Sequence, residues 1–162
     1  MGRSYEDFEV GATYRSRIGR TVLEADNVWF TALTMNTNEI HFNAEAAART
    51  EWGRPLVNSC LTLALVLGLS VADTSERSAV NLGWERVVLP NPVFAGDTLW
   101  AETEVLAVRE SRSRPEHGIV SVRTRGLNQR GEPVIEFSRS FMVPKREAAV
   151  DAFPAADAEW TI

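Results

Sequence analysis

The chain has 162 residues, of which 44% are hydrophobic and 24% charged, a balance typical of one folded domain of ordinary size. It excludes a disordered tail, a collagen-like rod and a coiled coil. The formal net charge of −5 argues against a general nucleic-acid-binding protein. The single cysteine, Cys60, can form neither an internal disulfide nor a zinc-ligand set. No apolar run follows a basic start, so we expect no secretory signal and a reduced, cytoplasmic location.

The first half of the chain is expected to be mainly helical. Residues 12–21 fit one short strand, and acidic residues open a helix over 24–35. Asn43 is placed to cap a short helix over 44–49. Residues 56–72 are the most apolar stretch, but they are fewer than the roughly 20 apolar residues that a bilayer requires. They therefore predict a helix buried inside the protein.

The second half of the chain shows the alternation of strands. Residues 80–89 read as a strand that ends at a proline pair, and residues 99–107 alternate with a period of two. The same alternation returns in 119–127 and 135–143, and residues 128–132 between them read as a hairpin turn. We expect long antiparallel strands here.

Helices followed by long antiparallel strands predict an α+β fold. A curved antiparallel sheet wrapped around one long apolar helix is the hotdog fold, which we expect as a single domain over residues 1–146. Residues 147–162 read as a loose tail. Because such a sheet has open edges, which are usually covered by pairing, we expect a homodimer or a dimer-based oligomer.

The two histidines differ in their settings. His117 lies among turn residues and reads as a solvated loop residue. His41 lies between a polar loop and two helices, near Asn36 and Asn38. A loop histidine often satisfies local backbone groups, but its ordinary pKa near neutrality also makes His41 the candidate acid/base of the chain.

Four segments carry a family resemblance, and in chain order they are Leu33–Phe42, Ala46-Ala47, Gly53–Val57 and Pro92–Leu99. The first resembles the Asp-x-Asn-Pro-x-His signature of the MaoC-like dehydratases, the family of (R)-specific enoyl-CoA hydratases. The resemblance covers about residues 5–145. It implies a hotdog domain, a dimer, a thioester substrate on coenzyme A or acyl carrier protein, and reversible syn addition of water. It implies no metal or redox cofactor.

The resemblance also assigns roles to single residues. His41 matches the catalytic histidine, and Asn38 matches the asparagine of the loop. Ser59 stands where a backbone N–H of the family binds the thioester oxygen, and the neighbouring Asn58 is expected in the substrate site with it. A serine can supply the same backbone donor at a helix N-terminus.

Two positions depart from the family pattern. Asn36 stands where the family has its catalytic aspartate, and Glu39 replaces the proline. An amide can orient water, but it cannot take up a proton at neutral pH. His41 would then carry most of the proton transfer while Asn36 holds the water.

A narrower resemblance suggests the substrate. The segments Asp26–Thr31, Asn36–Asn38 and Asn81–Trp84 look like a subgroup that carries asparagine in place of the aspartate. That subgroup is associated with short branched or dicarboxylic thioesters such as mesaconyl-CoA and itaconyl-CoA. Arg54 and Arg86 are the candidate cations for a second carboxylate, although a surface or packing role is the more common one for such arginines.

A cluster of arginines forms the densest positive patch of this acidic chain: Arg109, Arg112, Arg114, Arg123 and Arg125. Arginine suits phosphate groups, so Arg112 and its neighbours are expected to bind the phosphates of coenzyme A. The alternative is a solvated hairpin whose charges pair with nearby glutamates, namely Glu102, Glu104 and Glu110.

Together these observations predict a hydratase or dehydratase that acts on a short enoyl-CoA thioester. Its partners would be the acyl-CoA and a second copy of the chain, with neither nucleic acid nor membrane. One alternative is a hotdog thioesterase, in which Glu39 or Glu45 would activate water. Another is a non-catalytic acyl-CoA-binding subunit, or one half of a heteromer whose partner brings the aspartate.

Overall fold

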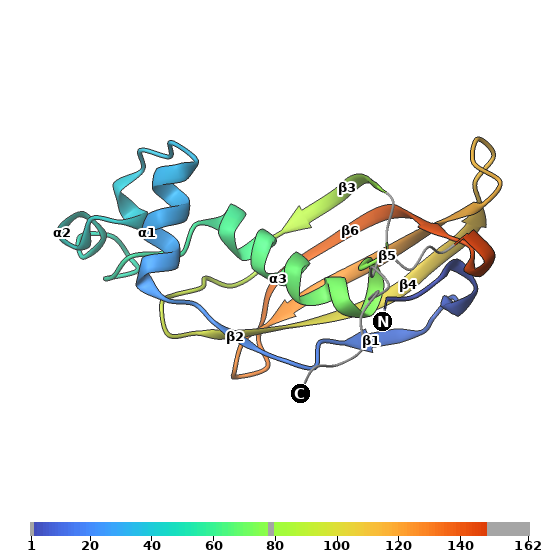
Figure 1. Cartoon of the computed structure of the whole chain (residues 1–162). Coiled ribbons are helices and arrows are strands. Elements are labelled where there is room, and N and C mark those ends of the chain that lie inside the picture. The colour runs from blue at the N-terminus through green and yellow to red at the C-terminus, as the bar shows by residue number, and fades with distance from the viewer. Residues whose placement is uncertain (1, 78–79, 149–162) are drawn as a thin grey trace, which may run out of the picture.

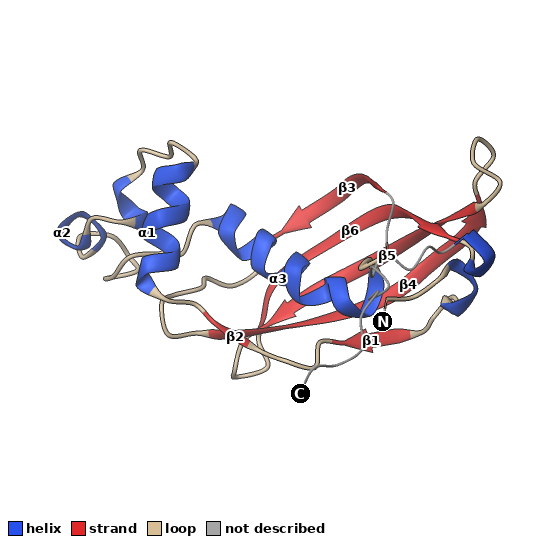
Figure 2. Cartoon of the chain, in the orientation of Figure 1, coloured by secondary structure: helices blue, strands red, loops and turns tan. Residues whose placement is uncertain are grey.

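The computed structural model describes residues 2–77 and 80–148, and its strands and helices are distinguished in Figure 2. The helical elements are the 3₁₀ turns η1 (Tyr5–Asp7), η2 (Glu39–His41) and η3 (Arg146–Ala148) and the α-helices α1 (Glu24–Leu33), α2 (Ala44–Ala47) and α3 (Ser59–Thr74). The strands are β1 (Thr13–Arg15), β2 (Arg20–Thr21), β3 (Val80–Val88), β4 (Thr98–Glu110), β5 (His117–Leu127) and β6 (Pro133–Pro144).

The strands form one antiparallel sheet in the order β1-β4-β5-β6-β3, and β2 pairs with another part of β4. The helix α3 lies along one face of this sheet, whereas α1 and α2 stand together beyond one end of it (Figure 1). The predicted α+β hotdog fold, with its antiparallel sheet around a long apolar helix, is confirmed.

The long apolar helix begins three residues later than predicted. Asn58 is its N-cap, and the Asn58 Oδ1 accepts a hydrogen bond from the Cys60 N–H at 3.0 Å. The predicted start at Leu56 is wrong because the Leu56 N–H bonds the Ile40 carbonyl at 3.0 Å, outside any helix. The capping asparagine therefore decides where α3 starts.

The core lies between α3 and the sheet. Leu61 and Val66 of α3 are buried against sheet residues that include Leu99, Ile135 and Phe137. The opposite face of the helix carries small residues (Ala64, Gly68 and Ala72), which are exposed in a single chain. One chain thus covers only one side of a helix that is apolar all round.

Residues 12–21 do not form the single strand that the sequence predicts. They form β1 and β2 with a break between them, and both strands pair with β4. The break begins at Ser16, whose hydroxyl accepts the hydrogen bond from the Ala101 N–H at 3.0 Å. A side chain here takes the place of the backbone partner that a continuous strand would offer.

The C-terminal end of α3 is held by a buried arginine. Arg139 of β6 donates to the hydroxyls of Thr74 at 3.1 Å and Ser75 at 2.9 Å, and its guanidinium lies 4.7 Å from the centre of the Phe141 ring. Burial lowers the pKa of Arg139 to about 10, so it remains charged at neutral pH. A cation at this end complements the helix dipole.

The loop before β4 is organised by Asp97. Its carboxylate accepts hydrogen bonds from the Phe94 N–H at 2.9 Å and from Gln129 Nε2 at 2.7 Å, and Arg130 lies 3.5 Å away. Burial alone would raise the pKa of Asp97, but these donors outweigh burial and lower it below its ordinary value of 3.8.

The proposed division into a domain over residues 1–146 and a tail over 147–162 stays a prediction. Arg146 contacts the first turn, where its guanidinium bonds Asp7 at 2.6 Å. Residues 149–162 lie outside the described part of the chain. Among the described residues, none of the helices is both long and apolar enough to cross a membrane.

Replacing Asp97 tests the loop and its pH dependence. Asp97→Asn turns one acceptor into a donor that faces Gln129 or the Phe94 N–H, so we expect the free energy of unfolding at pH 7 to fall by about 1–3 kcal/mol. Because folding lowers the pKa of Asp97, its contribution is complete above its ordinary value of 3.8 and is lost as the pH falls through the folded-state pKa.

Denaturant unfolding of wild type and Asp97→Asn between pH 7 and pH about 3 should show the gap between them closing in the acid range. Asp73→Asn is the control, because in the described part of the chain the Asp73 side chain makes no hydrogen bond. A gap that stays constant down to the lowest pH would contradict the role of the carboxylate.

Candidate functional site

The loop after α1 is built from two consecutive asparagine turns. Met35 adopts a left-handed backbone with a φ of 54°, and the Asn36 Oδ1 then accepts a hydrogen bond from the Asn38 N–H at 2.9 Å. The Asn38 Oδ1 in turn accepts from the Ile40 N–H at 3.3 Å and caps η2. The loop thereby delivers His41 to the base of α3.

His41 is buried, with 8% of its surface exposed. Its Nδ1 lies 2.8 Å from the carbonyl oxygen of Leu56. Because a carbonyl can only accept, Nδ1 must carry the proton and Nε2 keeps a lone pair in the neutral ring. The imidazole is therefore oriented by the backbone, with the nitrogen that can take up a proton left available.

Asn27 of α1 joins this histidine to the start of α3. Its Nδ2 donates to the His41 carbonyl at 2.7 Å and to the Leu56 carbonyl at 3.1 Å, and its Oδ1 accepts from the Asn58 N–H at 2.8 Å. Only 3% of Asn27 is exposed. The sequence showed Asn27 inside a recognised segment, but nothing in that segment indicated these contacts.

The N-terminus of α3 faces an apolar pocket. Ser59, the first residue of the helix, lines a pocket of about 210 Å³ together with Trp52, Leu56 and Val93. In the part of the chain that the structure describes, no acceptor bonds the Ser59 N–H. This end of α3 can therefore stabilise negative charge on a bound ligand.

Neither of the two arginines considered for a second carboxylate is among the residues that line this pocket. The Arg54 guanidinium stacks over the Phe94 ring at 3.9 Å, and Phe94 packs against Trp52 of the pocket with ring centres 6.4 Å apart. Arg86 lies in an irregular part of β3, with a φ of 47°, three residues before Leu89 of the pocket. Within the described chain neither arginine forms an ion pair.

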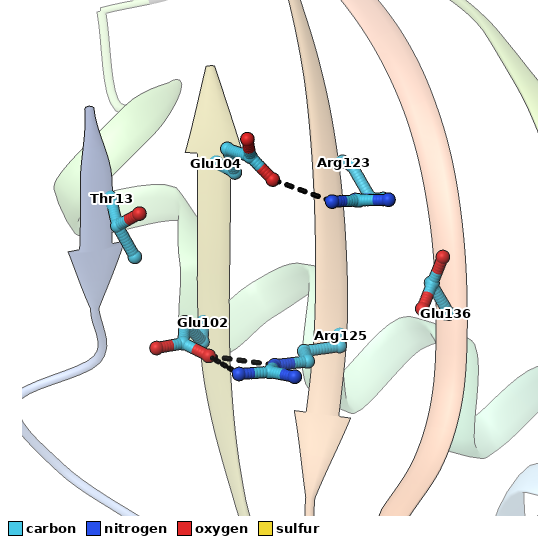
Figure 3. A pocket seen from close by; sticks show the side chains of 6 residues that line it. All are labelled: Thr13, Glu102, Glu104, Arg123, Arg125 and Glu136. Atoms are coloured by element: carbon cyan, nitrogen blue, oxygen red, sulfur yellow. Dashed lines mark hydrogen bonds and ion pairs between the residues drawn. The ribbon is translucent and has the colours of Figure 1, made fainter. Parts of the chain in front are cut away.

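Two arginines of the positive cluster pair with the glutamates that the alternative interpretation named. The Arg123 guanidinium bonds Glu104 at 2.7 Å, and the Arg125 Nε bonds Glu102 at 2.6 Å (Figure 3). Arg15 also bonds Glu102 at 2.9 Å, and these hydrogen bonds from Arg15 and Arg125 lower the pKa of Glu102. The pairs line a hollow of about 330 Å³ on the face of the sheet away from α3.

Arg112 lies in the β4–β5 hairpin, and this hairpin lies at the end of the sheet opposite α1 and α2 (Figure 1). The 13 residues of β4 separate this hairpin from the Asp97 loop, a distance of about 40 Å. A single chain therefore does not bring Arg112 together with the other predicted site residues. Glu110, one of the suggested partners, bonds Lys145 at 2.9 Å.

The two glutamates that a thioesterase would use as bases lie in the turn η2 and in the short helix α2. The Glu39 carboxylate accepts a hydrogen bond from Asn43 Nδ2 at 2.9 Å, and Glu45 is exposed at the start of α2. Among residues 2–77 and 80–148 there is no group of three or more histidine, cysteine, aspartate or glutamate residues that could hold a metal ion.

The sequence model of the mesaconyl-CoA hydratase family matches residues 1–159. The mesaconyl-CoA hydratase of Cereibacter sphaeroides is 36% identical over 151 residues, which are 93% of this chain and 44% of that protein. The (R)-specific enoyl-CoA hydratase of Aeromonas caviae is 31% identical over 128 residues, covering 79% of this chain and 90% of that protein.

Among solved structures, the MaoC-like dehydratase from Rhodospirillum rubrum has a TM-score of 0.78 and 32% identity, covering 90% of this chain and 99% of that chain. This chain therefore spans less than half of the mesaconyl-CoA hydratase that it matches but nearly all of the shorter relatives.

Proposed function

Because the chain belongs to the mesaconyl-CoA hydratase family, we propose that it adds water to, or removes it from, the α,β double bond of a short enoyl-CoA thioester. The observation that carries this proposal is the pair of groups at the base of α3. His41 is held by its Nδ1 so that Nε2 has a free lone pair, and the N-terminus of α3 opens onto an apolar pocket.

The geometry supports a simple sequence of proton transfers. Nε2 of His41 takes a proton from water as the water oxygen bonds the β carbon of the substrate. The electron pair of the double bond moves toward the thioester, and the N–H groups at the start of α3, including that of Ser59, stabilise the enolate oxygen. The imidazolium then returns the proton to the α carbon, so no proton is gained or lost overall.

Asn36 is the residue proposed to hold the water. Its Oδ1 uses one lone pair on the Asn38 N–H, which leaves a second lone pair for a water molecule. Asn38 itself caps the turn that carries His41, so we assign it the role of shaping the loop. Asn58 acts on the substrate through the helix terminus that it caps.

We further propose a short, branched or dicarboxylic acyl group, such as the mesaconyl group in the family's name. Its second carboxylate needs a cation near the pocket, and Arg54, whose guanidinium lies over the Phe94 ring, is better fixed for this than Arg86. Apart from coenzyme A as part of the substrate, the mechanism requires no cofactor. A cytoplasmic location, where coenzyme A thioesters are handled, goes with this proposal.

A second copy of the chain is the proposed partner. The strand β3 forms one edge of the sheet, and its exposed apolar side chains include Leu82, Trp84 and Val88, each exposed by 42–47%. The exposed face of α3 is a second surface that another chain could cover. The matched mesaconyl-CoA hydratase is more than twice as long as the region it shares with this chain. A second copy would take the place of that additional length.

Hydration is tested by following the loss of double-bond absorbance in a panel of enoyl-CoA thioesters. We expect wild type to hydrate at least one of them and His41→Ala to lose about 10²–10⁴-fold in kcat, the usual contribution of general acid–base catalysis. Asn36→Asp is measured in parallel. If the aspartate variant hydrates and wild type does not, the proposed function is wrong.

The substrate class is tested by the ratio of kcat/KM for mesaconyl-CoA to that for crotonyl-CoA, which lacks the second carboxylate. Arg54→Met should lower this ratio about 10–100-fold, because a hydrogen bond to a charged group contributes about 1.5–3 kcal/mol. Arg86→Met tests the second candidate in the same way. An unchanged ratio in both variants would exclude these arginines as carboxylate receptors.

The dimer is tested by sedimentation. Wild type should sediment as two chains of 18.0 kDa each, and Trp84→Glu, which places a charge on the edge strand, should sediment as one chain with reduced activity. Leu106→Glu changes a side chain of similar exposure on β4 and should remain dimeric. A wild type that sediments as one chain would contradict the proposal.

A further inference from the structure

We infer that Asn27 is a positioning residue that fixes His41 relative to the N-terminus of α3. The inference rests on the proposed function and adds to it a determinant of the reaction rate on α1, away from the pocket. Asn27 contacts three separate segments: the end of η2 at His41, the approach to α3 at Leu56, and the cap of α3 at Asn58.

The hydrogen bonds of Asn27 hold its side-chain amide in one orientation. Both hydrogens of its Nδ2 have backbone carbonyls as partners, and its Oδ1 accepts a backbone N–H, all at 2.7–3.1 Å. With only 3% of the residue exposed, water cannot replace these partners. The amide therefore adds three fixed contacts beside the one backbone hydrogen bond that joins the Leu56 N–H to the Ile40 carbonyl.

The Leu56 carbonyl links Asn27 to His41. The Leu56 oxygen accepts one hydrogen bond from Asn27 and another from His41 Nδ1, so movement of Leu56 changes the orientation of the imidazole directly. The Asn27 Oδ1 accepts a hydrogen bond from the N–H of Asn58, the residue that caps α3. One side chain thus couples the acid/base to the donors for the enolate oxygen.

Neither of the two side chains closest in size to asparagine reproduces this pattern. Aspartate has no hydrogen to donate and would face two carbonyl oxygens, and leucine fills a similar volume without polar atoms. Leucine also leaves the Asn58 N–H without its acceptor, which lets the start of α3 shift. Displacements of about 1 Å at a reacting group are enough to lower a rate about 10²-fold.

Loss of Asn27 should affect kcat more than KM. Asn27 is not among the residues that line the apolar pocket, so its loss should act on kcat and leave KM nearly unchanged. We expect Asn27→Leu to lower kcat about 10–100-fold with KM changed by less than about threefold. A role in stability alone would lower the amount of folded enzyme without changing kcat per folded molecule.

The matched control is Thr124→Val, which removes a buried hydrogen bond to Thr103 at 2.9 Å within the sheet. It should destabilise the fold to a similar degree and keep kcat. A double-mutant cycle with His41→Ala then tests whether Asn27 and His41 act together. If Asn27 acts through His41, Asn27→Leu has little further effect in the His41→Ala background. Equal effects in both backgrounds would overturn the inference.

A second measurement is independent of turnover. With ¹⁵N-labelled histidine, the imidazole signals of the neutral rings report which nitrogen carries the proton, and the chain has only two histidines, so His117 serves as an internal reference. Wild-type His41 should be protonated on Nδ1, and Asn27→Leu should show a mixture of the two tautomers. Wild-type His41 protonated on Nε2 would overturn the inference even where the variant fails to fold.

The two measurements separate the inference from the proposed function. If wild type hydrates none of the thioesters but the tautomer changes as expected, the proposed function fails and the positioning of the ring stands. If wild type hydrates and Asn27→Leu retains both kcat and the wild-type tautomer, the function stands and the positioning role of Asn27 is wrong.

Discussion

The carbonyl oxygen of Leu56 is the point at which the site is held together. It accepts hydrogen bonds from His41 Nδ1 at 2.8 Å and from Asn27 Nδ2 at 3.1 Å, three residues before α3 begins. Because a carbonyl never donates, both bonds have a fixed direction, and the ring must carry its proton on Nδ1. The tautomer with a lone pair on Nε2 is thus set by a backbone carbonyl.

The helix α3 depends on buried polar groups at both ends. At its start Asn27 and Asn58 satisfy backbone groups, and at its end the Arg139 guanidinium bonds Thr74 and Ser75. The sense of the helix dipole agrees with this placement, since a cation lies at the C-terminal end and the Ser59 N–H, which has no acceptor among the described residues, lies at the pocket. A 16-residue helix, about 24 Å long, is in this way fixed so that its N-terminus stays where the substrate is expected.

The sequence predicted the fold class because the alternating strands and one apolar segment admit few arrangements. It also predicted the cap at Asn43, whose Oδ1 accepts from the Glu45 and Ala46 N–H groups, since capping is a local interaction. It did not predict Asn27, because that amide bonds residues 14 to 31 positions away and only the tertiary fold brings them together. Nor could it place Arg112 relative to the other site residues, since hairpin geometry decides which end of the sheet a loop occupies.

The arginines on the outer face of the sheet and the arginine near the pocket differ in their partners. On the outer face Arg123 and Arg125 each have a glutamate on the neighbouring strand, so their charge is already neutralised and coenzyme A phosphates would have to displace those partners. Arg54 instead rests on Phe94, and the described residues give it no carboxylate. An arginine held on an aromatic ring keeps its outward N–H groups for a ligand at little cost in side-chain freedom. A carboxylate that enters beside Trp52 would therefore meet a fixed and unpaired cation, whereas on the sheet it would compete with glutamates already in place.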